Sequence, residues 1–470
     1  MDDVGIDVVA RAFAWTQRAV WLMRVAATHR LVGPTSAHAW VSSSAATSAR
    51  GSTQGSSVSS MQYLAARLRR LRGAQPPSAT PDKCDEDLCA STPRQSNPTH
   101  LFFLVHGLGG RPEDLSALSD VLQHRGGSTG GVLVHLARAN QRRLYTYDGI
   151  QSGGSRLAAE LRSLVSAHPG LTHVSLVGNS LGGLYCRYAA ALLWEPESQT
   201  IAGLRPVSFL TTASPHLGVG QHGHLRIIPR PLQHAGGALL GTSIKQLLLL
   251  DDATSTVGLK NGVVEGFAQA PAPLLLRMGT DEAFLAPLRA FARRHVYANA
   301  VNDFLVAYET AAFSLNGLPK SQLRPERSGN PTTMRLNRGP RVLFTKHRPP
   351  SDTEQQQQQQ QQFSGTSASS ARSRGADIAA WQAAMARGLG TMGWNETAVV
   401  FPGLLPLAHN RIVALRRDPV LTWINACGMA VVEHTAETLL SAARDATGAA
   451  VEEFIDEGRS ARADGSLQAA

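Results

Sequence analysis

The chain has 470 residues, 43% of them hydrophobic, and a formal net charge of +10 at pH 7. This hydrophobic content suffices for a large buried core, but no apolar run reaches the ~18 residues that would cross a bilayer. The basic residues form no nucleic-acid-binding motif, so we expect no nucleic-acid partner. A positive surface suits anionic lipid, although solvated tails would account for the charge equally well. Four cysteines exclude a disulfide scaffold and indicate a reducing, cytoplasmic compartment.

Residues 1–99 are interpreted as a largely disordered N-terminal extension. Residues 32–60 are rich in Ser, Ala, Thr and Gly, which is typical of a linker. Residues 8–31 and 61–72 have the pattern of short amphipathic helices. The N-terminus lacks the features of a secretory signal, but organelle targeting or membrane contact by residues 8–31 stays open.

From residue 100 onward, predicted strands alternate with predicted helices. The predicted strands are 101–105, 131–135, 172–177, 206–211, a strand-like segment within 294–303, and 396–401. The predicted helices are 112–123, 153–167, 181–194, 376–389 and 419–444. Helix-length connections between short apolar strands indicate an α/β fold, with a mostly parallel central sheet and helices on both faces.

We place the folded domain at residues 100–450 and treat 451–470 as a C-terminal tail. Two segments interrupt the domain. Residues 216–268 contain no strong strand and carry an apolar patch, so we interpret them as a lid or cap, with an ordinary core helix as the alternative. Residues 316–374 are rich in Pro, Arg and Ser and include a glutamine tract at 355–362, which predicts a disordered insertion.

The stretch VSLVGNSLGG, which begins at Val174, runs from an apolar strand into an apolar helix. A G-x-S-x-G turn between a strand and a helix is a nucleophile elbow, in which the hydroxyl of Ser180 stands clear of the backbone. Gly178 and Gly182 flank the serine because strand and helix pass too close there for side chains. The turn predicts Ser180 as a catalytic nucleophile.

A second glycine-rich loop, HGLGG from His106 to Gly110, follows the first predicted strand. In acyl-transfer enzymes of this architecture, that loop and the residue after the nucleophile each supply one backbone N–H of the oxyanion hole. We therefore predict Leu108 and Leu181 as the donors, with His106 and Gly107 supporting the loop. The alternative is a simple turn that leaves the strand.

A serine nucleophile needs a base to take its proton and an acid to hold that base, and the chain order here is serine, acid, histidine. Asp303 ends the strand-like segment and is the first candidate acid, although it could instead cap a following helix. Asp281 is the second candidate, but it opens an amphipathic run and resembles a cap. Asp251 and Asp252 lie in the proposed lid and rank lower.

His409 is the candidate base among sixteen histidines, because it follows the last predicted strand through a short loop. His106 stands too early in the chain for this role. His216, in TASPHLG, is expected at the mouth of the site as a pocket-lining residue. His434 lies within a long helix and is expected to be structural.

Five segments together resemble the lipase-like serine esterases of the α/β-hydrolase superfamily: FLVHGLGG, LVGNSLGGLYCRYA, FLTTASPHLG, YANAVNDFLVAYETAA and LAHNRIV. They span about residues 100–415. The resemblance implies an α/β-hydrolase fold and a soluble or membrane-peripheral esterase for lipid acyl esters, with no metal or organic cofactor. By position, Ser180 matches the nucleophile, Asp303 the acid and His409 the base. Asn179 stands where histidine is common among relatives.

The sequence thus predicts a lipase- or phospholipase-like serine hydrolase that works through an acyl-enzyme. Two other hypotheses stay open: an acyltransferase or thioesterase that uses the same residues, and a non-catalytic interaction module on a hydrolase fold. The acyl chain, the head group and the oligomeric state are not predicted.

Overall fold

The computed structural model describes residues 98–126, 131–142, 144–220, 222, 233, 240–251, 272–319, 341–350, 374–401 and 406–463. All of them belong to one compact unit, Gln95–Ala470. The predictions for residues 1–97, for most of the proposed lid and for the glutamine tract lie outside the described residues.

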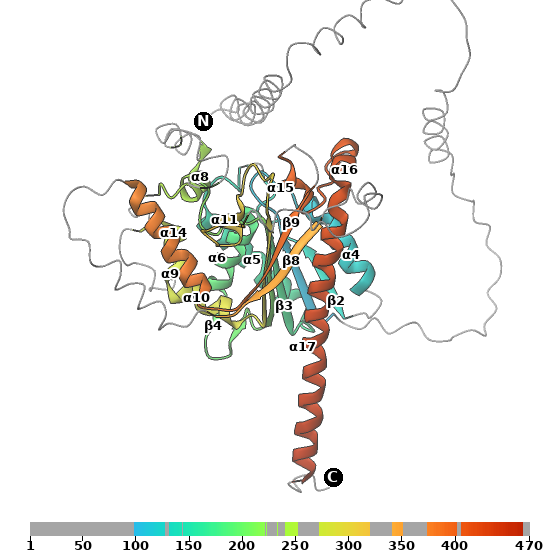
Figure 1. The fold of residues 1–470 in the computed structure, drawn as a ribbon. Helices are drawn as coiled ribbons and strands as arrows, with labels where there is room; N and C mark the ends of the chain where they lie inside the picture. Colours follow the sequence, from blue (N-terminus) through green and yellow to red (C-terminus); the bar gives the residue numbers. More distant parts are fainter. Residues whose placement is uncertain are drawn as a thin grey trace, which may run out of the picture. The chain divides into compact units, whose positions relative to one another are not determined.

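A seven-stranded sheet forms the centre of the domain, in the order β2-β1-β3-β6-β7-β9-β8 (Figure 1). Its strands are β1 (His100–Val105), β2 (Val132–Leu136), β3 (His173–Asn179), β6 (Arg205–Thr212), β7 (Arg293–Asn299), β8 (Arg341–Arg348) and β9 (Trp394–Val400). Neighbouring strands run parallel, except that β8 is antiparallel to β9. A separate two-stranded ribbon joins β4 (Trp194–Glu195) to β5 (Thr200–Ile201).

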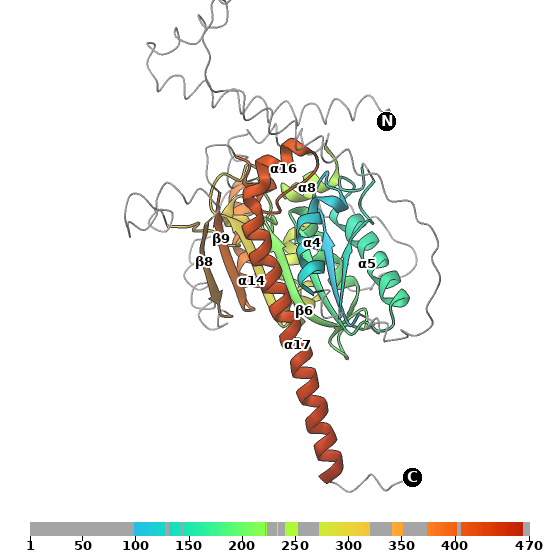
Figure 2. The same cartoon turned by 90° about the vertical axis from the view of Figure 1, so that its right-hand side faces the viewer.

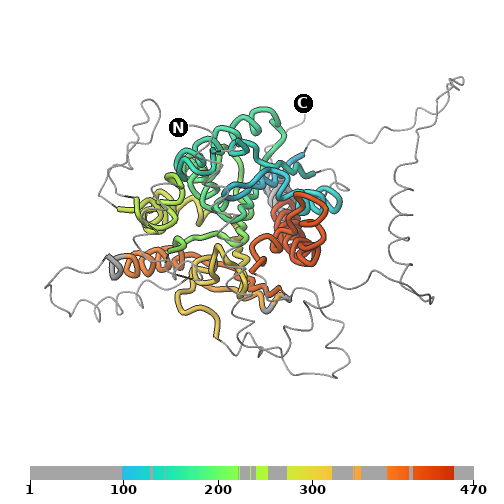
Figure 3. The backbone as a smooth tube through the Cα atoms, turned by 90° about the horizontal axis from the view of Figure 1, so that it is seen from above, coloured from blue at the N-terminus to red at the C-terminus, as the bar shows by residue number. Residues whose placement is uncertain are grey.

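Helices cover both faces of the sheet (Figures 1 and 2). On one side lie α5 (Ile150–Ala167), α6 (Leu181–Leu192), α9 (Leu274–Thr280), α10 (Glu282–Ala290) and α14 (Arg374–Gly390). On the other lie α4 (Ser116–Gly126) and α17 (Met429–Ala463), which are side by side in the view from above (Figure 3). Short elements at the ends of the strands are η1 (Pro112–Leu115), α8 (Thr242–Leu247), α11 (Tyr308–Ala311), α15 (Ala408–Arg411), α16 (Pro419–Asn425) and η5 (Ala426–Gly428).

Alternate side chains of one strand enter two different cores. Leu101 and Phe103 of β1 pack on the α5 and α6 side, whereas Phe102 and Leu104 pack on the α4 and α17 side. All six residues of β1 are buried, as burial on both faces of a parallel sheet requires. The predicted α/β-hydrolase fold, with its mostly parallel sheet and two helical layers, is confirmed. Among the described helices, none is both long and apolar enough for a membrane span.

The predicted helix 419–444 is wrong as a single element. The structure divides it into α16, η5 and α17, and α17 continues to Ala463. Asp418 caps α16 by accepting the N–H groups of Val420 and Leu421. The break falls at Gly428, where a Cβ atom would overlap the carbonyl of Arg411. This close backbone contact bends the chain between the two helices.

The prediction that residues 316–374 are disordered throughout is also wrong in part, because residues 341–348 form the edge strand β8. The segment as a whole is rich in Pro, Arg and Ser, but it contains the short run RVLFTKHR, whose Val, Phe and Thr residues favour a β-strand. Phe344 of this run packs against a small core cluster with Ala298 and Ala398. This packing and the ladder to β9 account for the strand.

The order of strands reverses direction between β1 and β3. From β1 the chain moves outward to β2, whereas from β3 it moves the other way through β6 and β7 to β9. In open α/β sheets, ligands bind at such a switch point, beyond the carboxyl ends of the strands. The loops that follow Val105 and Asn179 meet there, so the fold predicts a ligand-binding site at this edge of the sheet.

Two buried histidines on the strands of the central sheet make the stability of the domain sensitive to acid. Burial and the nearby His173 lower the pKa of His100 from 6.5 to about 3. Burial and the charges of Arg293, Arg294 and His434 lower the pKa of His295 to about 4. Because both rings stay neutral in the folded state, the unfolded state binds more protons once the pH falls below 6.5, and stability is lost as the pH falls toward the folded values.

We therefore expect the midpoint of thermal unfolding to fall as the pH is lowered from 7 to 5, and to fall less steeply in a His295→Asn variant. Circular dichroism at several pH values would measure this. His124→Asn, at an exposed position on α4, is the matched control and should decline in parallel with the wild type. Parallel curves for all three proteins would contradict the expectation.

Candidate active site

Ser180 lies on the turn between β3 and α6, with a backbone φ of 54° and ψ of −126°. A positive φ is costly for a residue with a Cβ atom and persists only where the surroundings enforce it. Here the N–H of Ser180 donates to the carbonyl of Thr212 at 2.9 Å, and the N–H of Gly183 donates to the carbonyl of Ser180 at 3.1 Å. The side chain is mostly buried, with 9% of the residue exposed.

Glycines allow the backbones around this turn to pass in contact. A Cβ atom on Gly182 would overlap the carbonyl oxygen of Val105, and one on Gly178 would overlap the backbone of Gly183. A Cβ atom on Gly107 would lie 2.7 Å from the Cβ of Ser180. The first turn of α6 therefore rests directly on the end of β1, which brings the serine beside the glycine-rich loop.

The glycine-rich loop forms a turn from Gly107 to Gly110. The N–H of Gly110 donates to the carbonyl of Gly107 at 3.1 Å, and the N–H of Gly109 donates to Oγ1 of Thr146 at 2.9 Å. These bonds engage two of the N–H groups that follow Gly107. The N–H of Leu181 belongs to the first turn of α6, where N–H groups have no partner within the helix.

Buried and charged side chains support the same loop. His106 lies at the end of β1, and its Nδ1 contacts the carbonyl of Gly107 at 3.1 Å, while burial lowers its pKa. Asp114 accepts the N–H of Arg111 at 2.9 Å and two bonds from Arg417, at 2.8 and 2.6 Å. Arg417 also donates to the carbonyl of Gly109 at 3.2 Å.

Asp303 and His409 meet although 106 positions separate them in the sequence. Nδ1 of His409 lies 3.0 Å from Oδ2 of Asp303, and their side chains are 12% and 1% exposed. Backbone contacts between the two loops hold this pair in place, namely a bridge between Asp303 and Leu407 and the bond from the N–H of Ala408 to the carbonyl of Asn302. An imidazole held in this way keeps its Nε2 for another partner.

The carboxylate of Asp303 is buried but well supplied with donors. Oδ2 accepts from the amide of Asn299 at 2.7 Å, and Oδ1 accepts the N–H groups of Leu305 and Val306, both at 2.9 Å. Burial favours the neutral acid, but His409 and these donors outweigh it and hold the pKa of Asp303 below its ordinary value. The group thus contacts a histidine and also accepts the N–H groups of the turn that follows it, whereas the alternative prediction of a helix cap is wrong, because the N-cap of α11 is Ala307.

The structure joins Asp303 and His409 by direct contact and places Ser180 on the same edge of the sheet, since β3, β7 and β9 are parallel. Among the contacts of the described residues, no hydrogen bond links Ser180 to His409. The assignment of these three residues to catalysis therefore stays a prediction. Asp281, the second candidate acid, instead pairs with Arg277 at 3.2 Å at the start of α10. Asp251, another candidate, accepts the N–H of Leu274 at 2.8 Å.

His216, predicted to line the pocket, is fully buried. Its Nε2 contacts Oγ1 of Thr211 at 3.0 Å, and its Nδ1 lies 3.5 Å from the guanidinium of Arg187. Burial and this neighbouring cation hold its pKa well below the ordinary value. These contacts lie behind the elbow, and none of them supports a position at the mouth. His434 contacts the hydroxyl of Tyr297 at 2.9 Å, which links α17 to β7.

Several supporting residues were not found from the sequence. Asn299 stands four positions before Asp303, a spacing that could have indicated it. Thr146 and Arg417 contact the glycine-rich loop from distant parts of the chain, and no local sequence pattern predicts these contacts. Across the described part of the chain, no group of three or more His, Cys, Asp or Glu residues is arranged to hold a metal ion.

Comparison with known proteins relates this chain to esterases and lipases. Residues 95–316 match the family described as "Putative serine esterase (DUF676)". This range includes Ser180 and Asp303 and ends before His409.

Two curated fungal relatives share part of this region. "Putative lipase ROG1" of Saccharomyces cerevisiae is 31% identical over 36% of this chain and 21% of its own length. "Putative lipase C4A8.10" of Schizosaccharomyces pombe is 26% identical over 48% of this chain and 27% of its own length. The chain therefore spans about a quarter of these relatives or less. Among solved structures, Bacillus licheniformis lipase BlEst2 in its mature form matches with 18% identity and a TM-score of 0.26, over 47% of this chain and 72% of that one.

The contact between Gly182 and Val105 predicts a large effect of one methyl group. Gly182→Ala should destabilise the domain by about 3 kcal/mol or more, because the backbone carbonyl cannot move aside. Gly448→Ala is the control, since nothing lies within 4 Å of the Cβ position on that helical glycine. It should be neutral or stabilise by up to about 1 kcal/mol. Urea unfolding would measure both, and equal stabilities would contradict the contact.

Proposed function

We propose that this chain hydrolyses carboxylic esters, with lipid acyl esters as the substrate class, because residues 95–316 match the serine esterase family. One observation carries the proposal: a buried Asp303–His409 pair at 3.0 Å, on the sheet edge where the strand before Ser180 ends. The names of the two fungal relatives, both given as lipases, support the choice of lipid esters.

In the proposed mechanism, Oγ of Ser180 attacks the ester carbonyl and its proton passes to Nε2 of His409. The bond from Nδ1 of His409 to Asp303 selects the tautomer that leaves Nε2 able to accept. Since Asp303 stays ionised, it also stabilises the imidazolium that forms. The negative oxygen of the tetrahedral intermediate receives the N–H groups of Leu108 and Leu181.

The intermediate then loses its alcohol, which takes the proton from His409, and Ser180 keeps the acyl group as an ester. Water, deprotonated by His409, attacks this acyl-enzyme and releases the fatty acid and the free serine. The two amides suit the oxyanion role because their neighbours are engaged elsewhere. Gly109 donates to Thr146 and Gly110 donates to Gly107.

Labelling by a fluorophosphonate probe tests the nucleophile. We expect the folded wild-type protein to be labelled and to hydrolyse p-nitrophenyl esters, and Ser180→Ala to do neither at unchanged stability. Ser175→Ala, at a buried serine on β3, the strand before the turn, is the control and should still be labelled. A folded wild-type protein that stays unlabelled and inactive would refute the proposal.

Replacement of the acid tests the pair. Asp303→Asn should lower kcat by about 10³- to 10⁴-fold, because the histidine is no longer held in the productive tautomer. Asp281→Asn is the matched control, since Asp281 contacts Arg277 and not His409. Steady-state kinetics on a soluble short-chain ester would compare them. A larger loss for Asp281→Asn than for Asp303→Asn would move the role of the acid to Asp281.

A further inference from the structure

We propose that Thr146 and Arg417 are positioning residues for the oxyanion hole, a proposal that rests on the ester hydrolysis proposed above. Both side chains bind Gly109, the residue after Leu108, from opposite ends of its backbone. Oγ1 of Thr146 accepts the N–H of Gly109 at 2.9 Å, and Nη2 of Arg417 donates to its carbonyl at 3.2 Å. Gly109 has a φ of 60°, so these bonds hold a conformation that an unconstrained glycine would leave readily.

The turn from Gly107 to Gly110 transmits this constraint to Leu108. Its N–H shares a peptide unit with the carbonyl of Gly107, which accepts the N–H of Gly110 at 3.1 Å. Holding Gly109 on both sides therefore sets the direction in which the Leu108 N–H points. An oxyanion donor must lie about 2.7–3.1 Å from the developing charge, so a small rotation of this peptide would weaken the bond.

Thr146 also links the two halves of the oxyanion hole. The hydroxyl of Tyr185, one turn after Leu181 on α6, donates to the carbonyl of Thr146 at 3.2 Å. The chain of contacts thus runs from the helix that carries the Leu181 N–H, through Tyr185 and Thr146, to Gly109 beside Leu108. Because Thr146 is only 2% exposed, water cannot readily replace its bond to Gly109.

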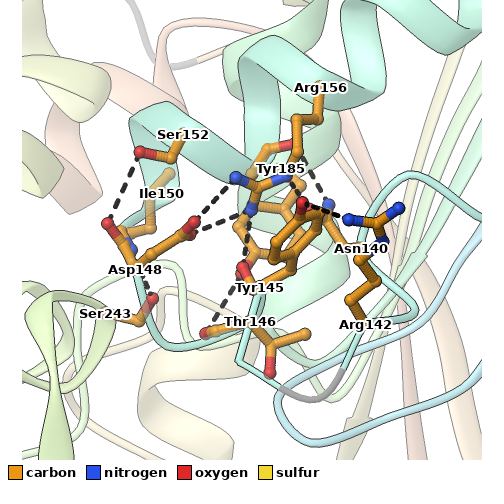
Figure 4. A network of polar contacts seen from close by, with 12 residues as sticks. Asn140, Arg142, Tyr145, Thr146, Asp148, Ile150, Ser152, Arg156, Tyr185 and Ser243 are labelled. Carbon is orange, nitrogen blue, oxygen red and sulfur yellow. Dashed lines mark hydrogen bonds and ion pairs between the residues drawn. The ribbon is translucent and has the colours of Figure 1, made fainter. Parts of the chain in front are cut away.

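Arg156 of α5 keeps the segment around Thr146 folded (Figure 4). Its guanidinium donates to the carbonyl of Tyr145 at 2.7 Å, to both oxygens of Asp148 at 2.7 and 2.9 Å, and to Oδ1 of Asn140 at 2.9 Å. It also lies over the Tyr145 ring, 4.2 Å from its centre. Arg156 thus binds three residues of this loop and holds in place the backbone on either side of Thr146.

Arg417 ties the same turn to the segment that follows His409. Besides Gly109, it binds Asp114 through Nε and Nη2, at 2.8 and 2.6 Å. Hydrogen bonds to Asp114, and its charge, raise the pKa of Arg417. Arg417 stands eight positions after His409, so its contacts fasten the oxyanion loop to the part of the chain that carries the proposed base.

The first test replaces Thr146 by Val, which keeps the shape and removes the acceptor. We expect kcat to fall about 10-fold or more with KM nearly unchanged, because only the transition state needs the aligned N–H. The affinity for a trifluoromethyl ketone, which forms a tetrahedral adduct with the serine, should fall by a similar factor. Thr146→Ser keeps the hydroxyl and should restore both quantities to within about threefold.

The second test uses two neighbouring arginines. Arg417→Met should lower kcat and the affinity for the ketone together, whereas Arg416→Met, which removes a bond to Asp120 instead, should leave both unchanged. Thermal unfolding of every variant shows whether the protein remains folded. If Thr146→Val does not fold, the Arg417 and Arg416 pair decides the question.

A folded Thr146→Val or Arg417→Met with wild-type kcat and ketone affinity would overturn the proposal for that residue. An equal loss for Thr146→Ser and Thr146→Val would also overturn it, since the hydroxyl would then not be responsible. These results differ from a failure of the proposed function, in which the wild-type protein itself neither hydrolyses esters nor reacts with the fluorophosphonate probe.

Discussion

The contact between the first turn of α6 and the end of β1 determines the rest of this site. Gly182 touches the backbone carbonyl of Val105 because the glycine carries no side chain. This contact fixes the start of α6 and, with it, the tight turn at Ser180, whose φ of 54° no isolated chain would maintain. The cost of that conformation is met by the packing of two buried elements, so the position of the Ser180 hydroxyl depends on the core beneath it.

A buried carboxylate organises the opposite side of the same edge. Asp303 gives up most of its hydration, and His409, Asn299 and two backbone N–H groups replace the lost water contacts. The same group therefore shapes the turn after β7 and orients an imidazole from the loop after β9. A carboxylate that also accepts the N–H groups of its own turn has little freedom to rotate away from His409, so the contact between the two side chains is held in place by the fold.

The sequence predicted those features that reside in local patterns, and missed those that require contact across the chain. The turn at Ser180 lies within a few residues, and the apolar strands around it are long enough to be recognised, so the fold class and the strand–turn–helix around Ser180 could be predicted. Asp303 and His409 came from their order along the chain and from a family resemblance. Thr146 and Arg417 could not be found, since the selection of these side chains depends on the three-dimensional course of distant loops. The edge strand β8 was not predicted, because the average composition of residues 316–374 is polar and the strand makes up only eight of them.

That edge strand has a consequence for how copies of the protein behave toward one another. A terminal strand offers unpaired backbone groups, which can template association with a second sheet. In β8 Lys346 and Arg348 lie on the same face of the strand and both pair with the buried Glu396 of β9, at 3.6 and 3.1 Å, while the exposed His347 stands between them in the sequence. The ion pairs with Glu396 hold these two cationic side chains along the edge of the sheet, where they would repel the same side chains on an approaching copy. Cationic side chains on an edge strand are one of the features by which proteins disfavour pairing with a second sheet.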